Sequence, residues 1–512
     1  MTSTLEGVSR RNFLKGAVAS GAILCAGGAM FGCSPAGDAE APVTGMPEKW
    51  DYETDVLCLG GGATGITAAL WAKYDGAESM ILEKGETSLA CSAALSDGQW
   101  CAGGTSVQKA QGIDDSPEKF YKWVESIQPK QKVCPSDLET AKVVCEAATP
   151  TLEWLLDLGA EVQGELQNFL DMDEKRWHTL KMQDVMNLLL GELDAQGVEM
   201  LTNTEATKLI VNADGRVIGA EAQKGSATIY CKARKAVVMG CGGYSASPEM
   251  LEKFNGPAFA KTKPVGCKTN TGDGYRMAMA LGAQLRDVYV DPSMALSTVE
   301  PLIGIVQWPR AGGILVNEQC KRYTAENIGA SPEAKATSMQ QGKTYIIMDE
   351  RFKGFEHAMI TYDRYIKMGG KEYKADTYED LAKQIGLDPA ALAETINTYN
   401  GYCAAGADPD FNRNTIDELE GSAPAPALDQ APYYAFEVCG AIYPIQMRLN
   451  TDTQARVRDQ WGNPIPGLYA GGLMGNIGIR NPDSGQVVTA LTGAFALGYI
   501  AGKDAAALEP WE

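Results

Sequence analysis

The chain has 512 residues, 45% hydrophobic and 21% charged, a composition typical of a globular protein with more than one domain. Its formal net charge of −20 disfavours nucleic acid and anionic lipid as partners, because like charges repel. Only two histidines, His178 and His357, are present, which excludes a histidine-rich metal site, and no two of the 13 cysteines form a C-x-x-C pair. We therefore expect no metal and interpret the cysteines as small core residues, with a cluster of scattered cysteines as the alternative.

The first 33 residues have the features of an export signal. Arg10 and Arg11 precede Asn12–Lys15, and residues 16–32 carry no charge. This pattern is typical of a twin-arginine signal peptide, and the apolar run is short for a membrane span; an N-terminal anchor is the alternative. The signal carries a net charge of +2, which leaves −22 for the rest of the chain. We expect an exported, extracytoplasmic protein without a further transmembrane segment, joined to its signal by a linker at residues 34–51.

The folded sequence begins with a strand–turn–helix–strand pattern. Asp55–Leu59 predicts a strand, Gly60, Gly62 and Gly65 follow at G-x-G-x-x-G spacing, and a second apolar run ends at Glu83. Such glycines allow a tight turn and let backbone N–H groups approach a pyrophosphate. An acid about 20 residues further on accepts hydrogen bonds from ribose hydroxyls. The pattern predicts a dinucleotide site, for either NAD or FAD.

Five later blocks of the sequence resemble a known protein family, and this resemblance decides between NAD and FAD. They are SAALSDGQWCAGGT at 92–105, KAVVMGCGGY at 235–244, NTGDGYRMAMALGA at 270–283, NPIPGLYAGG at 463–472 and GAFALGYIAG at 493–502. In this order they resemble the fumarate reductase/succinate dehydrogenase flavoprotein family. The resemblance is to its soluble single-chain branch, with flavocytochrome fumarate reductases, urocanate reductases and 3-ketosteroid dehydrogenases. It extends over about residues 53–505.

The resemblance implies an α/β fold, with a Rossmann-type FAD-binding domain and an inserted α+β capping domain. The FAD-binding domain is expected at residues 52–285 and 441–512, and the capping or substrate domain at 286–440. FAD is the implied cofactor. The implied cofactor-binding residues are Gly60, Gly62, Gly65, Glu83, Lys84, Ser92, Ser96, Gly98, Gly103, Gly104, Thr105, Gly242, Gly243, Asp273, Gly471, Ser484 and Gly485. The last two begin a helix whose positive dipole end would stabilise reduced flavin.

The chain departs from the fumarate reductases of this family at the substrate. Ala330 or Ser331 stands where the resemblance implies a catalytic arginine, and Tyr443 stands in place of a histidine. We therefore reject fumarate and succinate as substrates. The resemblance implies Tyr443 as the proton donor or carbonyl-polarising group, Arg480 as a substrate-binding residue and Arg310 as a weaker catalytic candidate.

These observations predict an exported FAD-dependent oxidoreductase that acts on CH–CH groups, as in anaerobic respiration. It would reduce an activated carbon–carbon double bond in a small-molecule enone or acrylate. The chain has no haem-attachment motif, so its electrons would come from a separate donor, such as a cytochrome. Two alternatives remain: a 3-ketosteroid-type dehydrogenase that works towards desaturation, and a non-catalytic flavin-binding electron carrier.

Overall fold

The computed structural model describes residues 46–128, 137–168, 172–286, 294–413, 415–418, 421–443, 447–475 and 490–511. The predicted export signal therefore lies outside the described residues, as do Arg480, Ser484 and Gly485. Among the helices that are described, none is both long enough and apolar enough to cross a membrane.

The larger of two main sheets has eight strands. They are β1 (Tyr52–Leu59), β2 (Ser79–Leu82), β5 (Glu199–Leu201), β6 (Thr204–Val211), β7 (Val217–Lys224), β8 (Ala227–Met239), β19 (Arg456–Arg458) and β20 (Pro464–Ala470). The order is β19-β20-β8-β1-β2-β5, with β7 paired to β8 and β6 to β7. Strands β20, β8, β1, β2 and β5 run parallel, whereas β19, β6 and β7 pair antiparallel. A parallel centre of this kind confirms the predicted α/β class.

Both faces of this sheet are buried, because its strands are apolar at successive positions. Val56 and Cys58 of β1 face one core, and Leu57 and Leu59 face the other. Helices α2 (Ala63–Tyr74), α5 (Leu138–Asp157), α6 (Met182–Gln196) and α15 (Ala490–Ala506) contribute to the first core. Helices α7 (Pro248–Asn255), α8 (Pro257–Ala260) and α9 (Asp273–Ala280) contribute to the second. The burial of Cys58 confirms its interpretation as a core residue.

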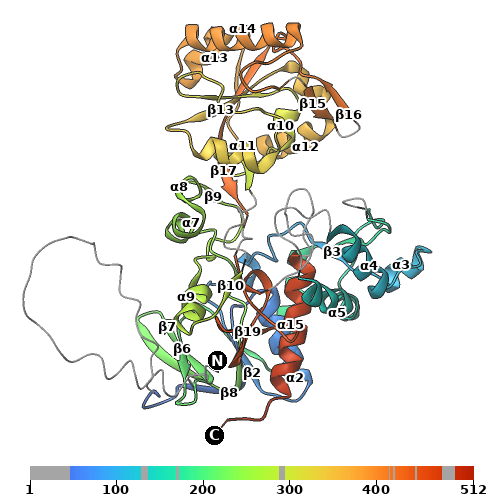
Figure 1. Ribbon diagram of the computed structural model, residues 1–512, viewed down its shortest axis with the longest axis vertical. Coiled ribbons are helices and arrows are strands. Elements are labelled where there is room, and N and C mark those ends of the chain that lie inside the picture. The colour runs from blue at the N-terminus through green and yellow to red at the C-terminus, as the bar shows by residue number, and fades with distance from the viewer. Residues whose placement is uncertain are drawn as a thin grey trace, which may run out of the picture. The chain divides into compact units, whose positions relative to one another are not determined.

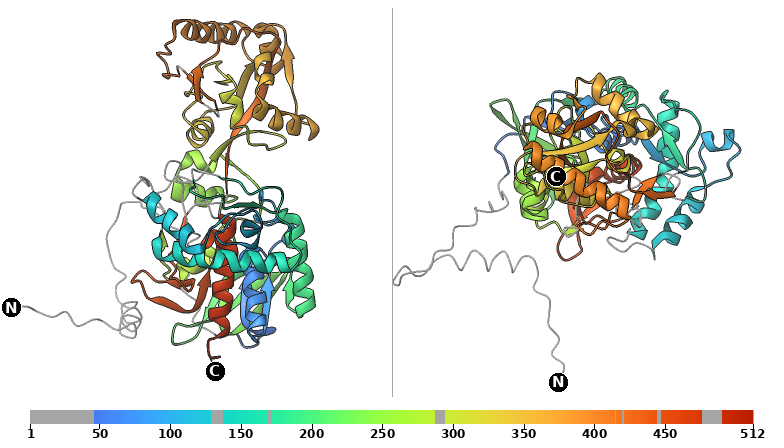
Figure 2. Two further views of the ribbon diagram at one scale, coloured as in Figure 1. Left: turned by 90° about the vertical axis from the view of Figure 1, so that its right-hand side faces the viewer. Right: turned by 90° about the horizontal axis from the view of Figure 1, so that it is seen from above.

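Helices α2 and α15 lie side by side although they are more than 400 residues apart in sequence (Figures 1 and 2). A Cβ atom at Gly498 would lie 2.7 Å from the Thr64 carbonyl oxygen. One at Gly502, a helical turn later, would lie 2.4 Å from the Ala68 carbonyl oxygen. The two glycines therefore permit a close helix crossing, which fixes the N-terminus of α2 from the far end of the chain.

The second main sheet lies in sequence between β8 and β19. Its strands are β9 (Lys263–Pro264), β11 (Met294–Thr298), β12 (Ile314–Asn317), β13 (Thr344–Asp349), β14 (Tyr373–Ala375) and β17 (Tyr433–Ile442). The order is β11-β17-β13-β12, and β14 and β9 also pair with β17. This antiparallel arrangement, with only β9 parallel to β17, agrees with the expected inserted α+β part. Its bounds at 286 and 440 stay predictions.

Helices cover both faces of the second sheet. Helices α13 (Tyr378–Ile385) and α14 (Pro389–Ala405) pack on one face, as Figure 1 shows. They share a hydrophobic core with Ile314 and Val316 of β12. Helices α10 (Gln307–Arg310) and α12 (Glu356–Lys367) pack on the other, against Leu315. The remaining elements are η1 (Ser88–Ala90), β3 (Gln99–Cys101), α3 (Ser106–Ala110), α4 (Pro117–Ile127), β4 (Trp177–Thr179), β10 (Leu285–Arg286), α11 (Ala330–Ser338), η3 (Glu350–Gly354), β15 (Thr415–Glu418), β16 (Gly421–Pro424), β18 (Arg448–Leu449) and η4 (Gly472–Met474).

Candidate active site

A pocket opens at the carboxyl ends of the central parallel strands, where β1, β2 and β8 terminate. This edge is the usual ligand-binding position of an open α/β sheet. Seven of the predicted cofactor-binding residues line it: Gly60, Gly62, Glu83, Lys84, Ser92, Gly242 and Asp273. The sequence pattern and the later blocks therefore meet at one place in the fold.

The glycines of the first turn have different physical roles. Gly60 has φ +102°, and a Cβ there would lie 2.5 Å from the Gly240 carbonyl oxygen. A Cβ at Gly65 would lie 1.9 Å from the Gly60 carbonyl oxygen, so Gly65 lets α2 pack against the turn. A Cβ at Gly62 would make only an ordinary contact, 3.9 Å from the Cβ of Cys91, so packing does not require glycine there. Gly62 is the N-cap of α2 and has no side-chain cap, so the N–H groups of the first turn can receive a pyrophosphate.

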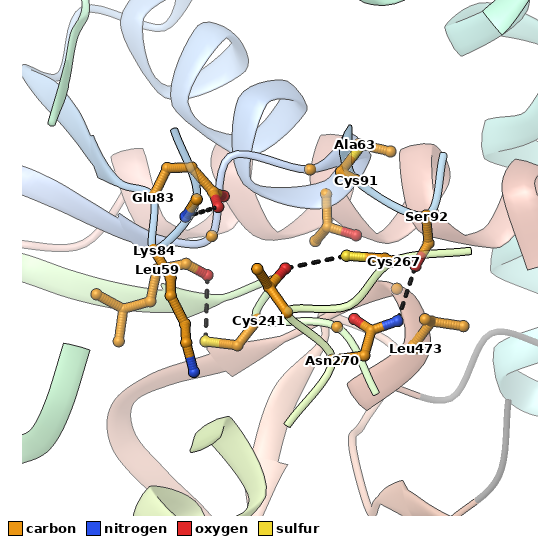
Figure 3. A pocket seen from close by; sticks show the side chains of 18 of the residues that line it. Leu59, Ala63, Glu83, Lys84, Cys91, Ser92, Cys241, Cys267, Asn270 and Leu473 are labelled. Carbon is orange, nitrogen blue, oxygen red and sulfur yellow. Dashed lines mark hydrogen bonds between the residues drawn. The ribbon is translucent and has the colours of Figure 1, made fainter. Parts of the chain in front are cut away.

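Glu83 is 8% exposed and fixes the turn from the end of β2. Its Oε2 accepts the Gly61 N–H at 2.6 Å. Its Oε1 accepts the Gly85 N–H at 2.6 Å (Figure 3). A carboxylate has about four acceptor sites, so both oxygens keep a lone pair for a ribose hydroxyl. The turn and the carboxylate fit the pyrophosphate and ribose of FAD, which the sequence resemblance implies.

Lys84 closes the same end of the pocket through an ionic cluster. Its Nζ lies 2.8 Å from Glu205 Oε1, 2.9 Å from Asp273 Oδ2 and 2.8 Å from Thr271 Oγ1. Burial lowers the pKa of Lys84, but the bonds to Glu205 and Asp273 outweigh it and raise the pKa above its ordinary value. The ammonium is therefore charged, and it holds together the ends of β2, β6 and α9.

The structure adds pocket residues that the sequence analysis missed. Asn270 donates through Nδ2 to Ser92 Oγ at 2.9 Å (Figure 3). Its Oδ1 accepts the Gly243 N–H at 3.2 Å. A Cβ at Gly242 would lie 2.1 Å from Asn270 Oδ1, which explains the glycine. The one available signal was the position of Asn270 immediately before the T-G-D-G block.

Three cysteines, Cys91, Cys241 and Cys267, also line the pocket. Burial raises the pKa of Cys91 to about 11, and it raises the pKa of Cys241 further. These two thiols stay protonated at neutral pH and form a weakly polar wall. In the described part of the chain, no group of three or more His, Cys, Asp or Glu side chains is placed to hold a metal.

Other predicted cofactor-binding residues lie outside the lining of this pocket: Gly65, Ser96, Gly98, Gly103, Gly104, Thr105, Gly243 and Gly471. Gly98 is required by packing, because a Cβ there would lie 1.7 Å from the Leu180 carbonyl oxygen. Thr105 is the N-cap of α3, and its Oγ1 lies 2.9 Å from Nε2 of the buried His178. At the other end, Gly472 lines the pocket next to the predicted Gly471. Contact of these eight residues with a cofactor stays a prediction.

Two of the three catalytic candidates lie next to the second sheet or on a helix that packs against it. Tyr443 directly follows β17, and Arg310 ends α10. Burial raises the pKa of the Tyr443 phenol, with a smaller contribution from the Asp97 carboxylate. Tyr443 therefore remains a proton-bearing group at neutral pH. Arg480 lies outside the described residues.

The parallel sheet, the glycine turn and the acid at the end of β2 define a Rossmann-type nucleotide-binding protein. The chain belongs to the fumarate reductase/succinate dehydrogenase flavoprotein family, because the model of the FAD binding domain family matches residues 55–486. It is 30% identical to a probable fumarate reductase of Shewanella frigidimarina, over 88% of this chain and 75% of the relative. It is 29% identical to the urocanate reductase of Eggerthella lenta, over 92% of this chain and 77% of the relative.

Comparison with solved structures leads to the same family. The open conformation of a flavocytochrome c3 fumarate reductase has a TM-score of 0.76 and 26% identity, and the match covers 99% of this chain and 82% of the other. FAD is therefore the cofactor, as the resemblance predicted. The chain is an FAD-dependent oxidoreductase whose relatives are named as reductases of compounds with carbon–carbon double bonds.

Proposed function

We propose that this protein is an exported reductase of an activated carbon–carbon double bond, in an enone or an acrylate rather than in fumarate. The named activities of its relatives support the reaction class, and urocanate is itself an acrylate. The export signal at Arg10 and Arg11 supports an extracytoplasmic location. Electrons would come from a separate donor such as a cytochrome.

The observation that carries the choice of acceptor concerns the start of α11. The resemblance implies a catalytic arginine there, and the chain has Ala330 and Ser331. The Ser331 hydroxyl accepts the Met294 N–H at 3.0 Å and donates to the Met294 carbonyl oxygen at 3.2 Å. Ser331 therefore fastens α11 to β11, and its hydroxyl is occupied. Without an arginine at this point, the site lacks both a positive charge that would bind a dicarboxylate and a proton donor for its reduction.

Tyr443 is the proposed replacement. When FAD is bound and reduced, it supplies a hydride to one carbon of the double bond. The Tyr443 phenol, protonated through the neutral range, would donate a proton to the other carbon or a hydrogen bond to the conjugated carbonyl. The predicted capping domain at 286–440 would exclude water from this site. Arg310 and Arg480 remain candidates for orienting the acceptor.

The experiment is anaerobic reoxidation of the chemically reduced holoprotein. Fumarate, urocanate, a cinnamate and an enone steroid are added one at a time, and the oxidised flavin band is followed. We expect rapid reoxidation by an acrylate or an enone and none by fumarate. Reoxidation by fumarate alone would contradict the proposed acceptor class, and silence towards every acceptor would favour a non-catalytic electron carrier.

A second candidate function is a dehydrogenase that introduces the double bond. Tyr443 favours it as well, because one phenol can accept or return the same proton. Adding a saturated 3-ketosteroid to the oxidised holoprotein tests this direction. Bleaching of the flavin band would support the dehydrogenase.

A further inference from the structure

We propose that His178 is a positioning residue of the FAD site. Its neutral ring, protonated at Nδ1, accepts the hydroxyl proton of Thr105 and thereby fixes the Gly103–Thr105 turn for contact with FAD. The inference goes beyond the proposed function, because it concerns how the cofactor is held and is independent of the acceptor. It gives a role to a buried titratable group that neither proton donation nor acceptor binding uses.

The hydrogen bonds of His178 define its tautomer. The side chain is fully buried on β4, and its Nδ1 lies 2.9 Å from the Arg176 carbonyl oxygen, which can only accept, so Nδ1 carries the proton. Its Nε2 lies 2.9 Å from Thr105 Oγ1, which already accepts the Gln108 N–H at 3.0 Å. The hydroxyl proton of Thr105 is therefore donated to Nε2 of a neutral ring. Burial lowers the pKa of His178, which agrees with this state.

The turn is also held by a second buried group. Oε1 of Gln108 accepts the Gly104 N–H at 2.6 Å and the Thr105 N–H at 3.1 Å. Nε2 of Gln108 donates to Asp115 Oδ2 at 2.9 Å. Arg176 binds the same carboxylate through Nε at 2.7 Å and Nη2 at 2.8 Å, and neither side chain of this pair is exposed. The imidazole and the ion pair therefore determine together where the backbone of the turn lies.

The turn is attached to a wall of the FAD pocket. Cys101, two residues before the turn, donates its N–H to Thr492 Oγ1 at 2.9 Å. Thr492 is fully buried on α15, and Ala494 of the same helical turn lines the pocket. Gly103 is buried, and its N–H has no hydrogen-bond partner among the residues that the structure describes. A buried N–H without a partner costs free energy, so we expect bound FAD to supply the acceptor.

Three variants separate this role from that of an ordinary helix cap. Thr105→Val keeps the shape of the side chain but leaves Nε2 of His178 and the Gln108 N–H without a partner, so the turn can move. Thr105→Ser keeps the hydroxyl and should restore the bond. Thr377→Val is the matched control, because Thr377 is the N-cap of α13 and accepts the Asp380 N–H at 3.1 Å.

The first measurement is FAD affinity, obtained by titrating flavin-depleted protein and following flavin fluorescence. We expect Thr105→Val to bind FAD about tenfold more weakly than wild type, whereas Thr105→Ser and Thr377→Val should bind it as wild type does. Full affinity in Thr105→Val would overturn the inference. Equal losses in Thr105→Val and Thr377→Val would also overturn it, because they would show only the effect of a lost helix cap.

The second measurement changes no residue of the turn, so it decides the matter even if Thr105→Val does not fold. The chain has two histidines, so protein labelled with ¹⁵N-histidine gives two sets of ring signals in NMR spectra, and His357→Gln assigns them. We expect the Nδ1–H tautomer for His178 in the holoprotein, and a change of its ring signals but not those of His357 when FAD is removed. A charged ring or the Nε2–H tautomer at neutral pH would overturn the inference, as would His178 signals that do not respond to FAD.

Discussion

Glu83 and Gly61 are joined by a hydrogen bond of 2.6 Å across 22 residues of chain. The bond ties the end of β2 to the glycine turn after β1, and Gly85 donates to the other oxygen of the same carboxylate. Two backbone donors therefore converge on one buried acid that lines the pocket. The acid organises the protein turn, and we predict that it also binds the ribose of FAD.

This geometry predicts the effect of Glu83→Gln. An amide has one acceptor oxygen, so one of the two N–H groups would face an NH₂ group and lose its partner, at about 1–3 kcal/mol. We expect FAD affinity to fall by about tenfold or more, measured by titrating flavin-depleted protein and following flavin fluorescence. The matched control is Glu86→Gln, an exposed acid three residues away. Equal affinity in the Glu83 and Glu86 variants would show that the carboxylate is dispensable.

Gly65→Ala tests the contact between the glycine turn and α2. The added Cβ would lie 1.9 Å from the Gly60 carbonyl oxygen, so the helix must shift away from the turn. We expect loss of about 3 kcal/mol or more of stability and a melting temperature lower by at least about 5 °C.

The control for this substitution is Gly191→Ala in α6. No atom lies within 4 Å of a Cβ at Gly191, and alanine is the better helix former there. We expect this variant to be unchanged or more stable by up to about 1 kcal/mol. A Gly65 variant as stable as the Gly191 variant would contradict the described packing.

Tyr443→Phe tests the proposed proton donor. The variant should bind FAD normally and reoxidise with an enone about 100-fold more slowly or worse, because proton donation is lost. Burial and Asp97 raise the pKa of this phenol above its ordinary value of 10. The wild-type rate should therefore show no ionisation of this donor between about pH 6 and 9. Stopped-flow absorbance measures both quantities, with Tyr230→Phe on β8 as the control; equal rates would remove Tyr443 from the mechanism.

Glu333 predicts a pH-dependent stability of the second part of the chain. It is 3% exposed on α11, and burial raises its pKa from 4.5 to about 8, with Glu326 adding to the rise and the Gly329 N–H opposing it. Between about pH 4.5 and 8, Glu333 therefore stays protonated in the native state but is ionised in the unfolded chain. Stability from this group is complete below about pH 4.5 and is lost as the pH rises towards about 8.

The measurement is chemical denaturation of wild type and Glu333→Gln at pH 5 and pH 8. Glutamine does not titrate and can keep the bond from Gly329. The variant should therefore gain stability relative to wild type by about 3 kcal/mol between pH 5 and pH 8. The exposed Glu379→Gln on α13 should show no such change. A pH-independent difference between Glu333→Gln and wild type would show that Glu333 is ionised in the native state.

The sequence pattern alone determined the nucleotide-binding turn, and the resemblance to a known family implied the α/β class and FAD as the cofactor. Gly60, Gly62, Gly65 and Glu83 lie within 24 residues of one another, so strand, turn and helix signals stand in one readable stretch. The steric need for Gly65 is local in the same way, because its Cβ would lie 1.9 Å from the Gly60 carbonyl oxygen. Such features follow from backbone geometry, which neighbouring residues dictate.

Only the tertiary structure decided which distant segments complete the pocket. Asn270 meets Ser92 across 178 residues, and Lys84 meets Asp273 across 189. These pairs arise because parallel strands that are neighbours in the sheet are not neighbours in sequence, so several helices and strands lie between them along the chain. No local periodicity encodes such a contact, since it depends on how the complete chain packs.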